Sequence, residues 1–187
     1  AYLDSKEFKN KIFTVAKFKE WYIKEKGAFT YCTDYRGFNI PDYVIDKFKD
    51  GSFDPLTEDE KWLLDNLKSA KEPYYVIGYV DIESEKETRK HELAHALYYL
   101  SSKYKNEVKN IITDLWSKIT PQLSNKIKAF LTKLEYNKEV WDDEINAYLI
   151  SDKEYLIKKN VWADELQEYR DILNEIFERN YLDFFGQ

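Results

Sequence analysis

The segment His91-Glu92-Leu93-Ala94-His95 contains both histidines of the 187-residue chain, placed four residues apart with a glutamate after the first. On a helix, residues i and i+4 lie on the same face, so the two imidazoles can bind one zinc ion together. Zinc lowers the pKa of a bound water toward ~7, and the carboxylate of Glu92 can then take its proton. The alternative is a pair of surface or packed histidines that binds no metal.

A catalytic zinc ion normally has three protein ligands and one open position, so a third ligand is needed. Since the chain has no other histidine, we expect a carboxylate; Cys32, far upstream, is the weaker alternative. Glu144 is preferred because its helical neighbours are apolar, small or aromatic, and a buried carboxylate requires a partner. These neighbours are Val140, Trp141, Ala147 and Tyr148. A buried ion pair with a lysine or arginine is the alternative explanation for Glu144.

The adjacent carboxylate, Asp143, is expected to face solvent because its helical neighbours Glu139 and Asn146 are polar. Adjacent residues of a helix point about 100° apart, so we expect only one of the two carboxylates to face the metal. If Glu144 is not the ligand, the next candidates are Glu107, Asp114, Glu135 and Glu139.

The motif must lie on a helix, and the sequence predicts one from about residue 84 to residue 102. Ser84 and Glu87 form a capping-box pattern at its start, and Leu93 and Leu97 belong to an apolar face that can anchor it. Residues 74–82 read YYVIGYVDI, a β-branched and aromatic run that is the best predicted strand. A strand just before this helix could pair with an extended peptide and hold it over the metal, or could simply pack against the helix.

Most of the remaining chain shows the apolar period of helices. Helices are expected over about residues 5–26, 41–50, 57–67, 104–119, 120–134, 139–150 and 162–177, with a weak strand over 28–33. The fold class is therefore α+β, a mainly helical domain with a small sheet preceding the active-site helix. We expect a single domain over residues 1–187, with a strand-containing part to about residue 83 and a helical part from about residue 103.

Composition limits the classes of partner. The net charge of −6 argues against a nucleic-acid partner, because binding of phosphates needs a basic surface. The longest apolar runs are only a few residues, so we expect no membrane partner. One cysteine allows no internal disulfide, and no apolar leader begins the chain, so we expect a cytoplasmic protein. Secretion after removal of a signal remains the alternative, and the oligomeric state stays open.

These motifs resemble those of zincin metallopeptidases and, among them, the gluzincin group. That group has H-E-x-x-H on one helix and a glutamate ligand on a later helix, often followed three residues on by a small residue. The matching residues here are His91, Glu92, His95, Glu144 and Ala147. The resemblance covers about residues 74–150. It implies one zinc ion, hydrolysis of peptide bonds, an upstream substrate-binding strand and a cleft between strand-rich and helical halves.

The chain also departs from related patterns. Tyr98 and Ser101 stand where metzincins have glycine and histidine, which excludes that group. Many gluzincins place an aspartate that supports a histidine four residues after the glutamate ligand, where this chain has Tyr148. Gluzincins often use a downstream histidine or tyrosine to stabilise the oxyanion. Since this chain has no further histidine, the resemblance implies a tyrosine, with Tyr148 and Tyr99 as candidates.

The sequence therefore predicts a zinc-dependent metallopeptidase acting on a peptide or protein substrate. His91, His95 and Glu144 are the expected metal ligands, and Glu92 is the expected general base and proton donor to the leaving amine. The alternative is a non-catalytic zincin-like module with a binding or regulatory role, which a missing oxyanion group or an occluded cleft would favour.

Overall fold

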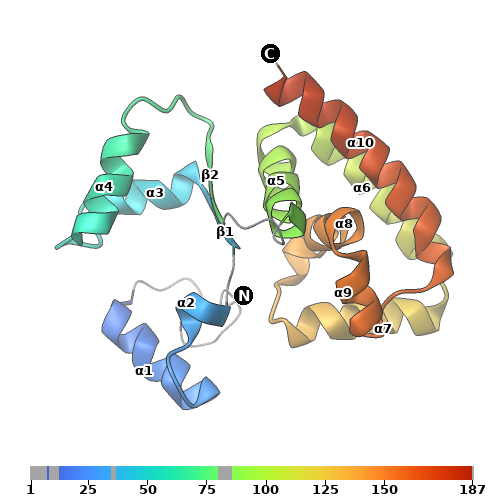
Figure 1. The fold of residues 1–187 in the computed structure, drawn as a ribbon, viewed down its shortest axis with the longest axis horizontal. Helices are drawn as coiled ribbons and strands as arrows, with labels where there is room; N and C mark the ends of the chain where they lie inside the picture. The colour runs from blue at the N-terminus through green and yellow to red at the C-terminus, as the bar shows by residue number, and fades with distance from the viewer. Residues whose placement is uncertain (1–7, 9–12, 35–36, 80–85, 187) are drawn as a thin grey trace.

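The structure, a computed structural model, describes residues 8, 13–34, 37–79 and 86–186. The described chain is α+β: mostly helical, with one small antiparallel sheet, as the sequence predicted (Figure 1). The N-terminal half contains α1 (Val15–Lys26), α2 (Tyr31–Asp34), β1 (Gly37–Pro41), α3 (Asp42–Lys49), α4 (Glu58–Leu67) and β2 (Tyr75–Tyr79). The C-terminal half begins with α5 (Lys86–Leu100), which carries the motif.

The C-terminal half is entirely helical over its described residues. After α5 come α6 (Ser102–Lys118), α7 (Pro121–Lys133), η2 (Lys138–Val140), α8 (Trp141–Ser151), α9 (Lys153–Lys158), η3 (Asp164–Leu166) and α10 (Gln167–Phe185). Helices α5, α6, α8 and α10 pack on one another and enclose the main hydrophobic core. Fully buried side chains of this core include Leu97, Ile112, Leu131, Ile145, Leu149 and Leu173. This core fixes α8 against α5, the two helices that matter for the site.

Local sequence signals set the starts of α6 and α7. The Thr120 side chain accepts a hydrogen bond from the Leu123 amide and Pro121 is the first residue of α7, as predicted. The Ser101 side chain caps α6 in the same way, so α5 ends at Leu100, slightly before the predicted end. The expected capping box at Ser84 lies outside the described residues. None of the described helices is long and apolar enough to cross a membrane.

The sheet differs from the prediction. Strand β2 spans Tyr75–Tyr79 and lies within the predicted 74–82 segment, of which residues 80–82 lie outside the described residues. Its partner is β1, with Asn39 opposite Ile77 and Gly37 opposite Tyr79. The predicted strand over residues 28–33 is wrong, because the short helix α2 occupies its end.

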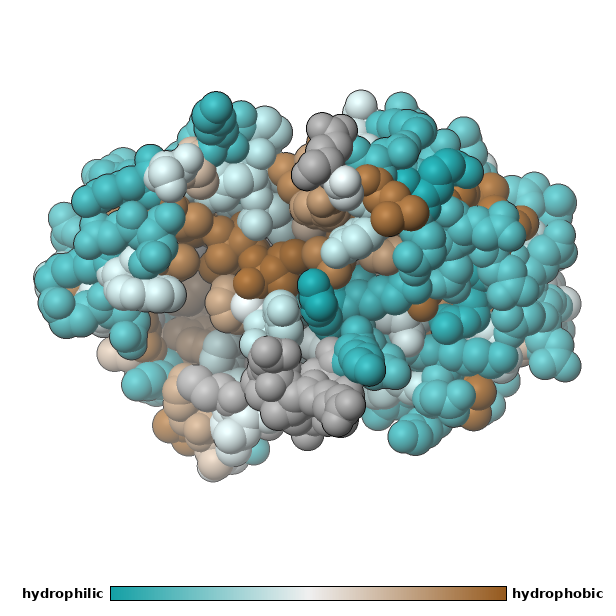
Figure 2. All heavy atoms as spheres, turned by 45° about the horizontal axis from the view of Figure 1, so that its top comes forward, coloured by the Kyte–Doolittle hydropathy of each residue, from teal (hydrophilic) through white to brown (hydrophobic). Residues whose placement is uncertain are grey.

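Both strands pack against α5, so the sheet lies between the helices of the N-terminal half and the motif helix (Figure 1). Residues two apart on a strand share a face, so Gly37 and Asn39 of β1 point to the same side. On the opposite side, the Phe38 ring covers Gly78, where an added Cβ would lie 2.1 Å from a ring carbon. Figure 2 shows mostly polar residues over both halves and apolar residues gathered in the hollow between them.

Candidate metal centre

The motif residues lie in the middle of α5 and face α8. His91 and His95 are one helical turn apart, and their ring centroids are 4.9 Å apart. Glu144, in the first turn of α8, lies opposite both rings. Its Oε2 is 3.9 Å from His91 Nε2, and its Oε1 is 3.8 Å from His95 Nε2. One donor atom from each of the three residues can be chosen so that all lie within 4.8 Å of one another.

The Glu144 carboxylate is buried without an ordinary counter-ion. Among the described residues no lysine or arginine forms an ion pair with it, so the ion-pair alternative considered for Glu144 lacks a partner there. Its Oε2 atom is buried and accepts no hydrogen bond from the described residues. Burial raises the pKa of the Glu144 carboxyl, although the imidazoles of His95 and His91 oppose the rise. A buried, unpaired carboxylate oxygen is costly unless a cation satisfies it.

Two further carboxylates hold the far sides of the imidazoles. His91 Nδ1 lies 3.0 Å from Asp152 Oδ2 and 3.3 Å from the Ser151 hydroxyl. His95 Nδ1 lies 2.9 Å from Asp143 Oδ2. Metal-bound histidines usually donate their second ring nitrogen to such a partner, which fixes the ring and leaves the other nitrogen for the metal. Here each Nδ1 is engaged, and each Nε2 faces Glu144.

The expectation that Asp143 faces solvent is therefore wrong. Its side chain is 20% exposed and contacts His95 from the side opposite Glu144. Both adjacent carboxylates can reach the histidines of α5 because an imidazole has two nitrogens on different edges. Burial disfavours protonation of His95, but the carboxylates of Asp143 and Glu144 outweigh it and raise the pKa of His95 to about 10.

The donor set fits zinc. Ligand atoms at tetrahedral zinc, about 2.0–2.1 Å from the metal, are separated by roughly 3.4 Å. The separations of 3.8 and 3.9 Å between Glu144 and the two imidazoles need to shrink by only a few tenths of an ångström. Two imidazoles and one carboxylate also leave the open position that a catalytic zinc requires. The buried Oε2 of Glu144 without a partner supports the same conclusion.

Glu92 lies on the same helix but belongs to a different set of contacts. Its Oε2 accepts a hydrogen bond of 2.6 Å from Asn39 Nδ2 of β1. Its Oε1 lies under Gly37, where an added Cβ would be 2.8 Å from it. Glu92 is thus held by the sheet rather than by α8, which agrees with a base that does not bind the metal.

The two tyrosine candidates differ in position. The Tyr148 ring lies 4.7 Å from the His91 ring, and its hydroxyl is 3.3 Å from that of Tyr136. The Tyr136 hydroxyl also opposes the rise in the pKa of the Glu144 carboxyl, so both phenols border the cluster. Tyr99 instead donates its hydroxyl to Asp42 at 2.5 Å and is engaged there.

The other carboxylates considered as ligands have partners elsewhere or face solvent. Glu107 pairs with Arg179 at 3.0 Å, and Asp114 pairs with Lys118 at 3.0 Å. Glu135 and Glu139 are exposed. The side chain of Cys32 lies outside the described part of the structure. Sequence reasoning missed the contacts of Asp152 and Ser151 with His91 and of Asn39 with Glu92, because each pair is more than fifty residues apart in the chain. It also missed Tyr136.

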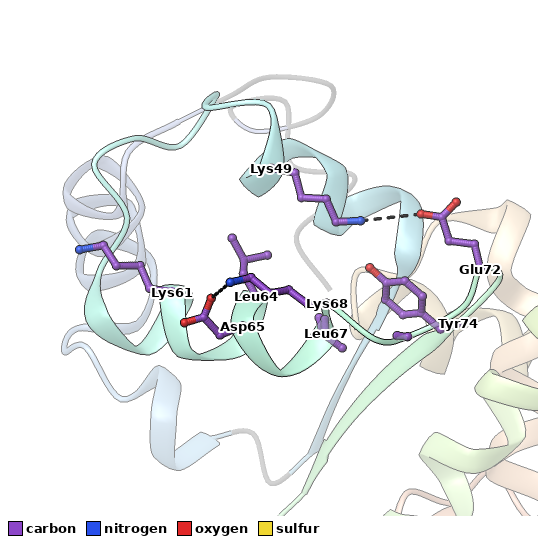
Figure 3. A pocket seen from close by; sticks show the side chains of 9 residues that line it. Lys49, Lys61, Leu64, Asp65, Leu67, Lys68, Glu72 and Tyr74 are labelled. Carbon is purple, nitrogen blue, oxygen red and sulfur yellow. Dashed lines mark ion pairs between the residues drawn. The ribbon is translucent and has the colours of Figure 1, made fainter.

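A cavity of about 380 Å³ lies elsewhere, between α3, α4 and the segment before β2 (Figure 3). Three lysines line it, but each is paired with a carboxylate. Lys49 pairs with Glu72 at 3.7 Å and Lys68 pairs with Asp65 at 2.8 Å. Lys61 pairs with Glu58 at 2.7 Å. The cavity therefore offers no unbalanced charge to a ligand, and the cluster on α5 and α8 is the stronger candidate site.

Comparison with known proteins adds no assignment. No family model, curated protein or solved structure matches the chain. Any assignment of function therefore depends on the geometry of the cluster itself.

Proposed function

We propose that the chain is a zinc-dependent peptidase of the gluzincin type, in which His91, His95 and Glu144 hold the metal and Glu92 is the general base. The observation that carries the proposal is the buried cluster of these three ligands, with both Nδ1 atoms held by carboxylates. Bound zinc would polarise the scissile carbonyl and make a water molecule acidic enough to react at neutral pH.

The protein groups then have separate roles. Glu92 accepts a proton as the water oxygen bonds to the carbonyl carbon, and it returns this proton to the amide nitrogen as the C–N bond breaks. Asp152 and Asp143 keep the imidazoles in one orientation throughout. The phenol of Tyr148, beside His91, is the better placed of the two candidates for stabilising the oxyanion.

A non-catalytic zinc-binding module is the second candidate, and one observation favours it. The base and two of the ligands are almost enclosed: Glu92 is 8%, His95 4% and Glu144 9% exposed. Strands β1 and β2 pack on α5, so a peptide reaching Glu92 would need the sheet to shift.

For the peptidase, the hollow between the two halves, with its apolar lining, is the proposed approach for an extended peptide (Figure 2).

The Glu92→Gln variant separates the two candidates. It keeps the size of the side chain and its capacity to accept from Asn39, but it removes the base. A peptidase should retain one equivalent of zinc and lose ~10²–10⁴-fold in activity. The test is cleavage of a broad peptide library by zinc-loaded wild type and variant, with metal content measured for both. A zinc-loaded wild type that cleaves nothing would support the non-catalytic module.

A further inference from the structure

Two residues of the sheet contact Glu92, and a third holds one of these two; the proposed mechanism has not yet used them. Asn39 Nδ2 donates to Glu92 Oε2 at 2.6 Å, and Tyr75 Oη donates to Asn39 Oδ1 at 2.7 Å. Asn39 and Tyr75 lie on neighbouring strands and share the face that packs on α5. Gly37, two residues before Asn39, leaves room for the other carboxylate oxygen.

The direction of these two hydrogen bonds is fixed by chemistry. A carboxylate only accepts, so Asn39 must present its NH₂ group to Glu92 and its carbonyl oxygen to Tyr75. Burial raises the pKa of the Tyr75 hydroxyl, and the carboxylates of Asp143 and Glu92 raise it further, so the phenol stays protonated and donates. Tyr75 therefore determines which end of the Asn39 amide faces the base.

The hydrogen bond from Asn39 to Glu92 affects both the energy and the geometry of the base. Glu92 is 8% exposed, and no lysine or arginine of the described residues pairs with it, so Asn39 is its main polar partner there. A hydrogen bond to an ionised carboxylate is about twice as strong as one between neutral groups. Asn39 already bonds to Oε2, so Oε1, the atom under Gly37, is the less engaged oxygen for taking a proton from water.

We propose that Asn39 is a positioning residue for Glu92, that Tyr75 sets the orientation of the Asn39 amide, and that the pair aims Oε1 of the base at the reacting water. This inference rests on the proposed peptidase function. The sheet thereby takes part in the reaction through the base, without contacting the metal ligands. The opposite relation, in which Asn39 blocks the base and keeps the enzyme inactive, is an outcome that the experiment below distinguishes.

The first readout does not depend on activity. In zinc-loaded protein labelled with ¹⁵N, the Asn39 side-chain amide is identified by its loss in Asn39→Ala. We expect its N–H signals to shift upfield and to exchange faster with water in Glu92→Gln and in Tyr75→Phe. Tyr79→Phe, the same change on the same strand, is the matched control and should leave the signals in place. An Asn39 amide signal that is insensitive to Glu92→Gln contradicts the proposal.

The second readout is kinetic. Asn39→Ala should lower kcat by ~10- to 100-fold, the loss typical of a misaligned catalytic group, with KM and zinc content unchanged. In the Glu92→Gln background the same substitution should have no further effect on the residual rate, since the base it positions is gone. If Asn39 had a merely structural role, Asn39→Ala would lower the rate by the same factor in both backgrounds. Tyr75→Phe, a milder change, should give a smaller loss of kcat in the wild-type background.

The outcomes separate the positioning role from the proposed function. A zinc-loaded wild type that cleaves no peptide contradicts the proposed function. An active wild type whose kcat is unaffected by Asn39→Ala and Tyr75→Phe contradicts the positioning role alone. A higher kcat/KM in Asn39→Ala also contradicts it and would mean that Asn39 blocks the base.

Discussion

Replacing Glu144 by glutamine should weaken zinc binding and, where no protonated His95 faces it, should stabilise the zinc-free protein. The amide keeps the size of the side chain but removes the charge that lies 3.8–3.9 Å from the two imidazoles. Breaking a buried charged contact typically costs ~3–5 kcal/mol. Since 1.4 kcal/mol is about tenfold in affinity, zinc binding should weaken by ~10²-fold or more. Competition with a chelator at fixed pH measures this loss.

In the zinc-free protein, the buried charge of Glu144 lowers the free energy of unfolding where no cation faces it. Glu144 Oε2 is buried with no hydrogen-bond donor among the described residues, and an unsatisfied buried group of this kind costs ~1–3 kcal/mol. At pH 8 His95, whose pKa the carboxylates raise to about 10, would be a cationic partner for Glu144, so the comparison is made with His95 replaced by leucine. We therefore expect metal-free Glu144→Gln/His95→Leu to unfold at higher urea concentration than metal-free His95→Leu at pH 8. Glu139→Gln, an identical change at an exposed position in η2, is the control and should leave the unfolding midpoint unchanged.

The sign of the pH dependence follows from the raised pKa of Glu144. A carboxyl whose pKa is higher in the folded state than its ordinary 4.5 favours folding while it is protonated and loses that contribution as pH rises through the folded value. In the His95→Leu background, the free energy of unfolding with Glu144→Gln minus that without it should therefore be near zero at about pH 4 and grow toward pH 8. A Glu144→Gln substitution that lowers stability at pH 8 in the His95→Leu background, or that leaves the zinc affinity of the otherwise wild-type protein unchanged, would refute the reasoning.

Two further substitutions test the groups around the cluster. Asp152→Ala removes the acceptor of His91 Nδ1 and should weaken zinc affinity by ~10–100-fold in chelator competition. The exposed neighbour Glu154→Ala is the control and should leave zinc affinity unchanged. Equal affinities of the two variants would show that Asp152 does not support the site. Gly37→Ala places a Cβ 2.8 Å from Glu92 Oε1, so it should lower kcat with zinc content unchanged. A wild-type kcat would show that β1 can shift to accommodate the methyl group without displacing Glu92.

The helical part of the fold was accessible from the sequence because its signals are local. The apolar period over residues 104–119 and the Thr120-Pro121 pair predicted α6 and α7 closely. Strand β1 was missed because Gly37, Asn39 and Pro41 are poor strand formers. Only pairing with β2 makes this segment a strand, and pairing across more than thirty residues of chain leaves no local pattern.

The site divides in the same way. His91, Glu92 and His95 could be recognised from their spacing, and Glu144 from the apolar neighbours that predicted its burial, which the structure confirms. Asp152, the partner of His91, lies sixty-one residues away in the chain, so no local sequence pattern near either residue predicts the contact. That the cluster binds zinc and hydrolyses peptides stays a prediction.

The metal ligands all come from α5 and α8, whereas the hydrogen bond to Glu92 comes from β1. A mutational scan of this protein should therefore yield two classes of inactive variant. Loss of a metal ligand on either helix would lower metal occupancy and could be rescued by excess zinc. Loss of Glu92, or of the sheet residues that hold it, would leave occupancy full and resist such rescue, because zinc affinity is intact and only the proton acceptor is missing or misplaced.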